Sequence, residues 1–207
     1  MEDIWLAWAK RLQSVASTGL HFARDEYDRE RYAQVSAIAN EMLSSLAGVP
    51  VGRIEGLLSD FAKGYETPKV DVRGAVFDDE KILLVRERSD DLWTLPGGYA
   101  DVGMSASENV VKEIREEASL GVRVQALYGI RHKAKHEYAP DLRDFYKLFF
   151  LCERTDGQAP QPGLETAEVG FFAMSELPPL SKGRTLEKDI VAAFAFKADP
   201  QRLALFD

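Results

Sequence analysis

The residues from 95 to 120 constrain the fold of this chain more than any other stretch. They read LPGGYADVGMSASENVVKEIREEASL, so that a strand-like Trp93–Leu95 stops at a proline and two glycines. The helix expected after the glycines carries Glu113, Glu116 and Glu117. At 3.6 residues per turn the last two lie roughly 60° and 40° to either side of the first. Like charges at these spacings repel, which indicates that a counter-charge is needed.

Oxygen-rich clusters suit hard divalent cations such as Mg²⁺ or Mn²⁺, which proteins commonly share with phosphate oxygens. The pattern therefore predicts a metal-dependent phosphoryl-transfer site, and the alternative is an ordinary acidic helix face in water. Ser105 and Glu108 fit a capping box that starts the helix. The apolar stripe is centred roughly 110° from Glu113, so the acidic side borders the buried side. That stripe consists of Val110, Val111, Ile114 and Ala118.

The segment resembles the signature of the Nudix hydrolases, in which a glycine and a short loop precede a helix with the pattern Arg-Glu-x-x-Glu-Glu. Here Gly98 opens the pattern and residues 112–117, KEIREE, close it at the family spacing. This spacing, between a strand and a helix, is a specific signal. The resemblance implies an α/β/α sandwich around a mixed sheet for residues 68–207. It also implies hydrolysis of a nucleoside diphosphate linked to another group.

Three positions depart from the family pattern. Met104 stands where the family usually has glutamate, Lys112 where it has arginine, and Ser119 where it has glycine. Lysine keeps the positive charge of arginine without its planar fork. Ser119 predicts that the helix ends differently, with Gly121 as a candidate left-handed cap. The three carboxylates are intact, whereas the number of metals and the role of each glutamate stay open.

The resemblance implies a role for each residue of the signature. Glu113 and Glu117, one helical turn apart, are the first candidates for metal ligands. Glu116 is a candidate for a further ligand or for the residue that positions the attacking water. The carbonyl of Gly97 can approach a metal closely because glycine has no Cβ. Lys112 is expected to support the acidic cluster or to contact phosphate.

Further candidates lie outside the signature. Family members often place another acid in a later loop, and Glu165 and Glu168 match that place. Either is a candidate for the general base, for a metal ligand, or for a solvated loop acid. Lys135 and His136 lie in a basic loop that could grip phosphate or base, with solvation as the alternative. The residues predicted to contact substrate are Arg86, Arg88, Gly98, Lys112, Lys135 and His136, with a salt bridge as the alternative for the two arginines.

Two domains are predicted. Residues 1–64 read as helices because large apolar side chains recur at helical spacing, and we interpret the tryptophans among them as packing residues. These side chains are Trp5, Trp8, Leu12 and Val15 in a first helix and Val35, Ile38, Met42 and Leu46 in a second. A third helix is predicted at residues 53–61, and turn signals at 63–68 indicate a linker.

Residues 68–207 read as strands with helices between and after them. The predicted strands are 70–77 and 82–85, which form a hairpin, then 122–130, 145–152 and 169–172. A closing helix is predicted at 185–196, with Ile190, Val191 and Phe194 on its apolar face. Strands and helices alternate without βαβ regularity, so the predicted fold class is α+β with a mixed sheet.

Composition excludes several classes of function. The net charge of −8 over 207 residues argues against a role on long nucleic acid or on a membrane surface, because phosphate binding needs a basic footprint. A small phosphorylated substrate is compatible, since a bound metal inverts the local field. Cys152 is the single cysteine and is expected to be buried in the core. Without a basic leader or an apolar run of membrane-spanning length, the chain is expected in the cytoplasm.

Residues 5–10, 65–71 and 95–103 also resemble a bacterial subgroup of the family with an N-terminal helical domain. That subgroup includes CDP-choline pyrophosphatases and proteins named ADP-ribose pyrophosphatases. The resemblance implies a pyrophosphohydrolase for a small nucleotide-derived substrate, with CDP-choline as the first candidate and ADP-ribose as the second. Two different functions also stay open, a non-catalytic nucleotide sensor and an enzyme that trims the triphosphate end of RNA. The helical domain is expected to form a homodimer.

Overall fold

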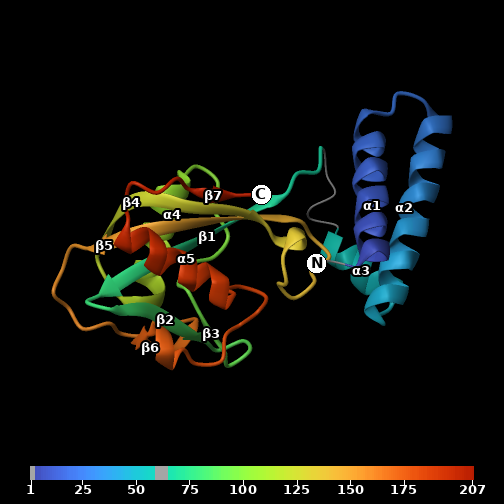
Figure 1. Ribbon diagram of the computed structural model, residues 1–207. Helices are drawn as coiled ribbons and strands as arrows, with labels where there is room; N and C mark the ends of the chain where they lie inside the picture. The colour runs from blue at the N-terminus through green and yellow to red at the C-terminus, as the bar shows by residue number, and fades with distance from the viewer. Residues whose placement is uncertain (1–2, 59–64) are drawn as a thin grey trace. The chain divides into compact units, whose positions relative to one another are not determined.

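The computed structural model describes residues 3–58 and 65–207, which divide into two compact units. One unit comprises Met1–Pro68 with Asp141–Asp144, and the other comprises Lys69–Pro140 with Phe145–Asp207. The first is helical and the second is a sheet flanked by helices (Figure 1). The predicted linker at 63–68 and the predicted third helix at 53–61 both lie partly outside the described residues. No helix in the described ranges has the length and apolar content needed to cross a bilayer.

Among its described residues, the first unit contains three helices, as the sequence predicted. They are α1 (Ile4–Phe22), α2 (Glu26–Ala47) and α3 (Val51–Leu58). Asp3 caps α1 because its side chain accepts hydrogen bonds from the amides of Trp5 and Leu6. Gly48, with φ at 63°, ends α2 in the left-handed conformation. Lys10 on α1 forms an ion pair of 2.5 Å with Asp144 within the same unit.

The first-helix tryptophans, which we interpreted as packing residues, are not buried within this unit. Trp5, Trp8, Leu12 and Val15 are 56%, 44%, 38% and 60% exposed. Small residues line the helix contact instead, since Ala9, Ala16 and Ala39 are fully buried. Gly19 is also part of the contact, because a Cβ there would lie 2.3 Å from the ring of Tyr32. Small side chains let α1 and α2 approach closely, and the large apolar residues face outward.

The second unit contains a seven-stranded mixed sheet. Its strands are β1 (Lys69–Asp78), β2 (Lys81–Glu87), β3 (Trp93–Thr94), β4 (Val122–His132), β5 (Phe145–Arg154), β6 (Thr166–Ala173) and β7 (Leu205–Phe206). The order is β3-β2-β1-β5-β4-β7, and β6 pairs with β2. The predicted hairpin is confirmed, because β1 and β2 pair antiparallel. Parallel pairing of β1 with β5 makes the sheet mixed.

Helices cover both faces of this sheet. On one face, Val72 and Val76 of β1 pack with Ile114 of α4 (Ala106–Ala118). On the other, Ala75 of β1 packs with Ile190 of α5 (Glu187–Ala198). Alternate residues of a strand point to opposite faces, so α4 and α5 lie on opposite sides of the sheet. This confirms the predicted α/β/α sandwich and the α+β fold class.

The predicted apolar face of the closing helix is partly wrong. Ile190 is buried, but Val191 is 47% exposed. The buried face is completed by Ala193 and Phe196, which follow Ile190 at intervals of three residues. Phe194 packs at the edge of this cluster. The run Ile190–Val191 contains one inward and one outward side chain, which local hydrophobicity alone does not distinguish.

Candidate functional site

The signature helix α4 begins at the predicted capping box. The amide of Ser105 donates to Glu108 Oε2 at 2.7 Å, and the amide of Glu108 donates to Ser105 Oγ at 3.2 Å. The predicted cap at the other end is wrong. Ser119 itself adopts the left-handed conformation, with φ at 56°, while the amide of Gly121 donates to Asp156. Where the family has glycine, this chain has a serine in the left-handed conformation that glycine adopts readily.

A tight glycine turn lies against this helix. The carbonyls of Pro96 and Gly98 accept hydrogen bonds from β1 amides at 2.9 and 2.8 Å. Between them Gly97 has φ at 142°, and a Cβ there would lie 2.0 Å from the carbonyl oxygen of Val72. The strand β1 also comes close to α4, because a Cβ on Gly74 would lie 2.6 Å from Ile114 Cδ1. Because Gly97 and Gly74 have no side chains, the strand, the turn and the helix can pack closely together.

Two of the signature glutamates face the glycine turn. The amide of Gly97 donates to Glu117 Oε2 at 2.8 Å. A Cβ on Gly98 would lie 3.1 Å from Glu113 Oε2, so the carboxylate occupies the space that a side chain would need. Both carboxylates come from consecutive turns of α4. The structure therefore brings Gly97, Gly98, Glu113 and Glu117 together in one place.

Burial raises the pKa of both carboxyl groups, so they ionise less readily in the absence of a cation. Burial raises the pKa of Glu117 to about 8, although the charge of Arg73 and the Gly97 amide act in the opposite direction. Burial also raises the pKa of Glu113, against the charge of Lys112. A divalent cation would favour the ionised form of both groups. Two half-buried to buried acids with raised pKa at a glycine turn thus fit a hard cation.

Glu116 takes a different position from the other two. Lys112 Nζ lies 2.9 Å from Glu116 Oε2, 3.3 Å from Asp101 Oδ2 and 3.8 Å from Glu113 Oε1. The hydrogen bond to Glu116 raises the pKa of Lys112, which is therefore a stable cation beside the cluster. Within residues 3–58 and 65–207, no group of three or more His, Cys, Asp or Glu side chains is arranged to hold a metal. Glu113 and Glu117 therefore lie together at the glycine turn, whereas Glu116 is paired with Lys112.

The loop before β6 packs against the end of α4. The amide of Gln161 donates to the carbonyl of Ala118 at 3.0 Å, and Thr166 Oγ1 donates to the carbonyl of Glu117 at 2.9 Å. The amide of Gly163 also donates to Glu117, and a Cβ on Gly163 would lie 1.7 Å from the carbonyl oxygen of Glu116. The loop satisfies carbonyls that the helix end leaves without partners.

This loop brings Glu165 to the site. Burial raises the pKa of Glu113 and of Glu87, and the negative charge of Glu165 adds to both shifts. Arg88 fixes the loop, because its amide donates to the carbonyl of Glu165 and its Nε to that of Leu164, both at 3.1 Å. Arg88 is thus a support for the loop, whereas the sequence left open a phosphate contact or a salt bridge.

Glu168 has a different neighbour. It lies opposite Arg86 in the pairing of β2 with β6, and Arg86 Nη2 donates to Glu168 Oε1 at 2.5 Å. Arg86 also forms an ion pair with Asp91. The structure therefore supports the salt-bridge alternative for Arg86 and gives Glu168 a cationic partner.

The predicted basic loop is tied to the C-terminal strand. Lys135 ends a short 3-10 helix, η1 (Lys133–Lys135), directly before His136. His136 Nε2 lies 2.6 Å from Asp207 Oδ1, and its Nδ1 lies 3.0 Å from Lys188 Nζ. Asp207 follows β7, which pairs with β4. These contacts link His136 to α5 and the C-terminal residues.

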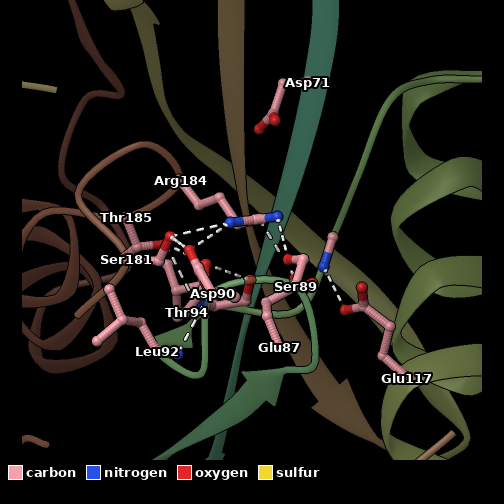
Figure 2. Close-up of polar contacts among 12 residues, drawn as sticks. Asp71, Glu87, Ser89, Asp90, Leu92, Thr94, Glu117, Ser181, Arg184 and Thr185 are labelled. Carbon is pink, nitrogen blue, oxygen red and sulfur yellow. Dashed lines mark hydrogen bonds and ion pairs between the residues drawn. The ribbon is translucent and has the colours of Figure 1, made fainter. Parts of the chain in front are cut away.

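Sequence reasoning missed Glu87 and Arg184. Glu87 ends β2 at an irregularity of the pairing with β6 and is buried. Arg184 Nε lies 3.4 Å from Glu87 Oε1, and its Nη1 lies 2.7 Å from Asp90 Oδ2. Figure 2 shows the guanidinium group of Arg184 next to the carboxylate of Glu87, with Glu117 beyond Glu87. The negative charge of Glu87 raises the pKa of Glu117. The sequence signal that could have identified Glu87 is an acidic residue shortly after the apolar run Ile82–Val85.

A buried ion cluster underlies the turn. Arg73 donates to both carboxylate oxygens of Asp71 at 2.9 Å and to the carbonyl of Leu95 at 3.1 Å. Lys147 Nζ lies 2.8 Å from Asp71 Oδ1. Although burial opposes it, the charges of Arg73 and Lys147 hold the pKa of Asp71 at about 2. Arg73 therefore stays a fixed cation close enough to act on Glu117.

Two family models match this chain. One, described as "Nudix_N: UDP-X-like, N-terminal oligomerisation domain", matches residues 3–58, and the NUDIX domain matches residues 67–194. A putative ADP-ribose pyrophosphatase of Bacillus subtilis (strain 168) is 41% identical over 203 residues, which cover 98% of this chain and 97% of the relative.

Solved structures give the same picture. A crystal structure of an ADP-ribose pyrophosphatase from Streptococcus suis 89-1591 has 40% identity and a TM-score of 0.62, over 68% of this chain and 100% of that one. A crystal structure of a UDP-X diphosphatase has 32% identity and a TM-score of 0.63, over 98% of each chain. The similarity to the second structure extends over both units.

Proposed function

This chain belongs to the Nudix family and is a pyrophosphohydrolase of that family, and from this premise we propose how its site works. Hydrolases of this family generally use divalent metal ions, and we propose Mg²⁺ or Mn²⁺ here. The observation that carries the proposal is the pair of acids Glu113 and Glu117, whose pKa values burial raises, beside Gly97 and Gly98.

Glu113 and Glu117 are the proposed metal ligands, together with the carbonyl of Gly97. When bound, the cation neutralises phosphate oxygens and lowers the pKa of bound water. Glu116 is proposed to complete the set or to position water, in which case it must leave the hydrogen bond with Lys112. Lys112 then becomes available to a phosphate oxygen. Gly98 leaves room for the Glu113 carboxylate because it carries no side chain.

Glu165 is proposed as the general base that takes a proton from the attacking water. Its loop is anchored to the helix that carries the proposed ligands, so the base and the ligands keep a constant relation. Glu168 is the weaker candidate because Arg86 neutralises it. Lys135, His136 and Arg88 stay candidates for the outer parts of the substrate.

The substrate is proposed to be a small nucleoside diphosphate derivative, cleaved to a nucleoside monophosphate and a phosphorylated alcohol or sugar. The relatives named ADP-ribose pyrophosphatases support ADP-ribose. The full-length similarity to a UDP-X diphosphatase supports a uridine compound, and CDP-choline stays a candidate from the sequence motifs alone.

A panel of these three compounds with Mg²⁺ and with Mn²⁺, in isotopically labelled water, tests the proposal. Product analysis identifies the nucleotide that is accepted and the phosphorus that water attacks. Glu117→Gln is the matched control, since it keeps the shape of the side chain and removes its charge. Tight nucleotide binding without turnover of any compound would instead favour the non-catalytic sensor.

We propose that the protein is a homodimer joined through its helical unit. The description of the family model that matches residues 3–58, an N-terminal oligomerisation domain, supports this. Light scattering at micromolar concentration tests it, and a monomer there would contradict it. Residence in the cytoplasm stays a prediction.

A further inference from the structure

We propose that Thr185, in the loop before α5, is a positioning residue for the reaction. Together with Arg73 it holds the backbone of Leu95 and so fixes the glycine turn that follows. The inference rests on the proposed function, because it takes the carbonyl of Gly97 as a ligand of the cation. It adds a residue far outside the signature that determines where this carbonyl lies.

Both backbone groups of Leu95 have a side-chain partner. The amide of Leu95 donates to Thr185 Oγ1 at 3.2 Å, and its carbonyl accepts from Arg73 Nη1 at 3.1 Å. Leu95 is fully buried, so these two side chains take the place of water. The next residue, Pro96, has a restricted φ and no amide hydrogen. The orientation of Leu95 is therefore passed directly to the glycine turn.

The contacts of Leu95 add to those that hold the rest of the turn. The carbonyls of Pro96 and Gly98 accept hydrogen bonds from β1, and the amide of Gly97 donates to Glu117. With Leu95 included, every residue from 95 to 98 has a backbone group with a fixed partner. Ligands of a cation must be held to within roughly 0.5 Å to work, so the loss of one anchor should be measurable at the metal.

Thr185 belongs to a buried pair of hydroxyl groups. Thr185 Oγ1 lies 2.8 Å from Thr94 Oγ1, and both residues are fully buried. The Thr94 hydroxyl donates to the carbonyl of Leu95 at 3.1 Å. Burying a hydroxyl group costs free energy unless it is hydrogen-bonded, whereas valine fills nearly the same space without that cost. Packing alone therefore gives no reason for the two hydroxyls, and their contacts with Leu95 do.

The loop that carries Thr185 is itself tied to β3. The amide of Thr185 donates to the carbonyl of Ser181 at 2.9 Å, and the amide of Ser181 donates to the carbonyl of Trp93 at 2.8 Å. The hydroxyl of Ser181 donates to Asp90 Oδ2 at 2.7 Å, as Figure 2 shows. Thr185 thus reaches Leu95 from a loop that is fixed to the residues directly before the turn.

Manganese binding by the full chain tests the inference. Thr185→Val removes the hydroxyl, and we expect the dissociation constant for Mn²⁺ alone, measured by electron paramagnetic resonance, to rise about 10–100-fold. Thr185→Ser keeps the hydroxyl and should bind Mn²⁺ as the wild type does. Ile190→Val is the matched control, because Ile190 is buried in the same apolar cluster as Leu95. It should lower the Tm without changing the affinity for Mn²⁺.

Steady-state kinetics separate a positioning role from a purely structural one. Thr185 is fully buried, so it acts on the reaction through the turn and not by touching substrate. At saturating metal, Thr185→Val should lower kcat and leave KM nearly unchanged. Thr185→Ser should restore kcat. A purely structural role would lower the Tm alone, as in Ile190→Val.

Hydrogen exchange keeps the inference testable if Thr185→Val does not fold. In the wild type the amide of Leu95 should exchange far more slowly than that of Gly157, where a Cβ would meet nothing within 4 Å. Equally fast exchange at both amides would overturn the inference.

Two further outcomes would also overturn it. They are an unchanged affinity for Mn²⁺ in a folded Thr185→Val variant, and equal losses in Thr185→Val and Thr185→Ser. In either case the proposed metal site itself would stand, because the wild type still binds Mn²⁺. A wild type that neither binds Mn²⁺ nor turns over the substrate panel would overturn the proposed function and this inference together.

Discussion

The helices α4 and α1 are both amphipathic, yet only α4 buries the apolar stripe that its sequence predicts. The α4 residues Val110, Ile114 and Ala118 are fully buried against the sheet of their own unit. On α1 the small residues are buried and the tryptophans are exposed. The difference teaches that periodicity identifies an apolar row but does not identify the partner that covers it. The partner of α4 lies in the same chain, and that of α1 is proposed to lie in another copy.

The largest expected effect is on α4. Glu117→Gln should reduce metal-dependent turnover by orders of magnitude, because it removes a proposed ligand charge while keeping the side-chain shape. Steady-state kinetics with Mg²⁺ and Mn²⁺ measure this, and circular dichroism checks the fold. Turnover close to that of the wild type would rule out the ligand role. In that case the burial of α4 would have no demonstrated role in catalysis.

Gly163→Ala should show whether the loop packed against the end of α4 is needed for catalysis. The new Cβ would lie 1.7 Å from the Glu116 carbonyl oxygen, so the loop must move and carry Glu165 with it. We expect a loss of about 1–3 kcal/mol of stability and a clear fall in kcat. Gly157→Ala is the matched control, since a Cβ on Gly157 meets nothing within 4 Å. Equal behaviour of the two variants would show that the loop does not position the base.

Leu43→Ala and Trp8→Ala sharpen the α1 side of the comparison. Leu43 is fully buried within the helical unit, so its truncation should cost about 2–5 kcal/mol of unfolding free energy. The cost of Trp8→Ala should depend on protein concentration, because the contacts that it removes are proposed to lie between copies. Denaturant titrations at two concentrations measure both. A Trp8→Ala effect that is independent of concentration would place the tryptophan contacts inside one chain.

The pH dependence of stability tests the burial of Glu117. Its folded pKa is raised from 4.5 to about 8, so the folded protein binds this proton more tightly than the unfolded chain. Without metal, the contribution of this group is complete below the lower value and is lost as the pH rises towards about 8. The Tm of metal-free wild type should fall over this window more than that of Glu117→Gln. Added Mg²⁺ should remove the difference, and parallel curves would contradict it.

The smallest effect is expected from Val191→Ala. Val191 is exposed on α5, so its truncation should change stability by less than about 0.5 kcal/mol. Ile190→Ala, one residue earlier and fully buried, should cost about 2–5 kcal/mol. Thermal unfolding measures both. Similar costs at the two positions would break the assignment of inner and outer faces on this helix.

Much of the fold and part of the site follow from local sequence. The capping box at Ser105 and the hairpin at β1 and β2 depend on neighbouring residues, and the structure contains both. The left-handed Ser119 was missed because serine has no general preference for that conformation. Glu87 and Arg184 meet only through folding, from β2 and from the loop before α5, so no local pattern joins them. The sequence places Trp5 and Trp8 in one apolar row, but the row alone does not show which residues of the chain leave it exposed.

The anchored loop before β6 limits how the length of this chain can change. Glu117 meets the glycine turn through its side chain and this loop through its own carbonyl, so it is held from two directions. Insertions around Gly157, where the backbone has open space, should leave both of these hydrogen bonds of Glu117 unchanged. A single residue added between Gly163 and Thr166 would shift Glu165 away from the helix that it serves. Length variation among natural or engineered versions should therefore concentrate on the early part of this loop.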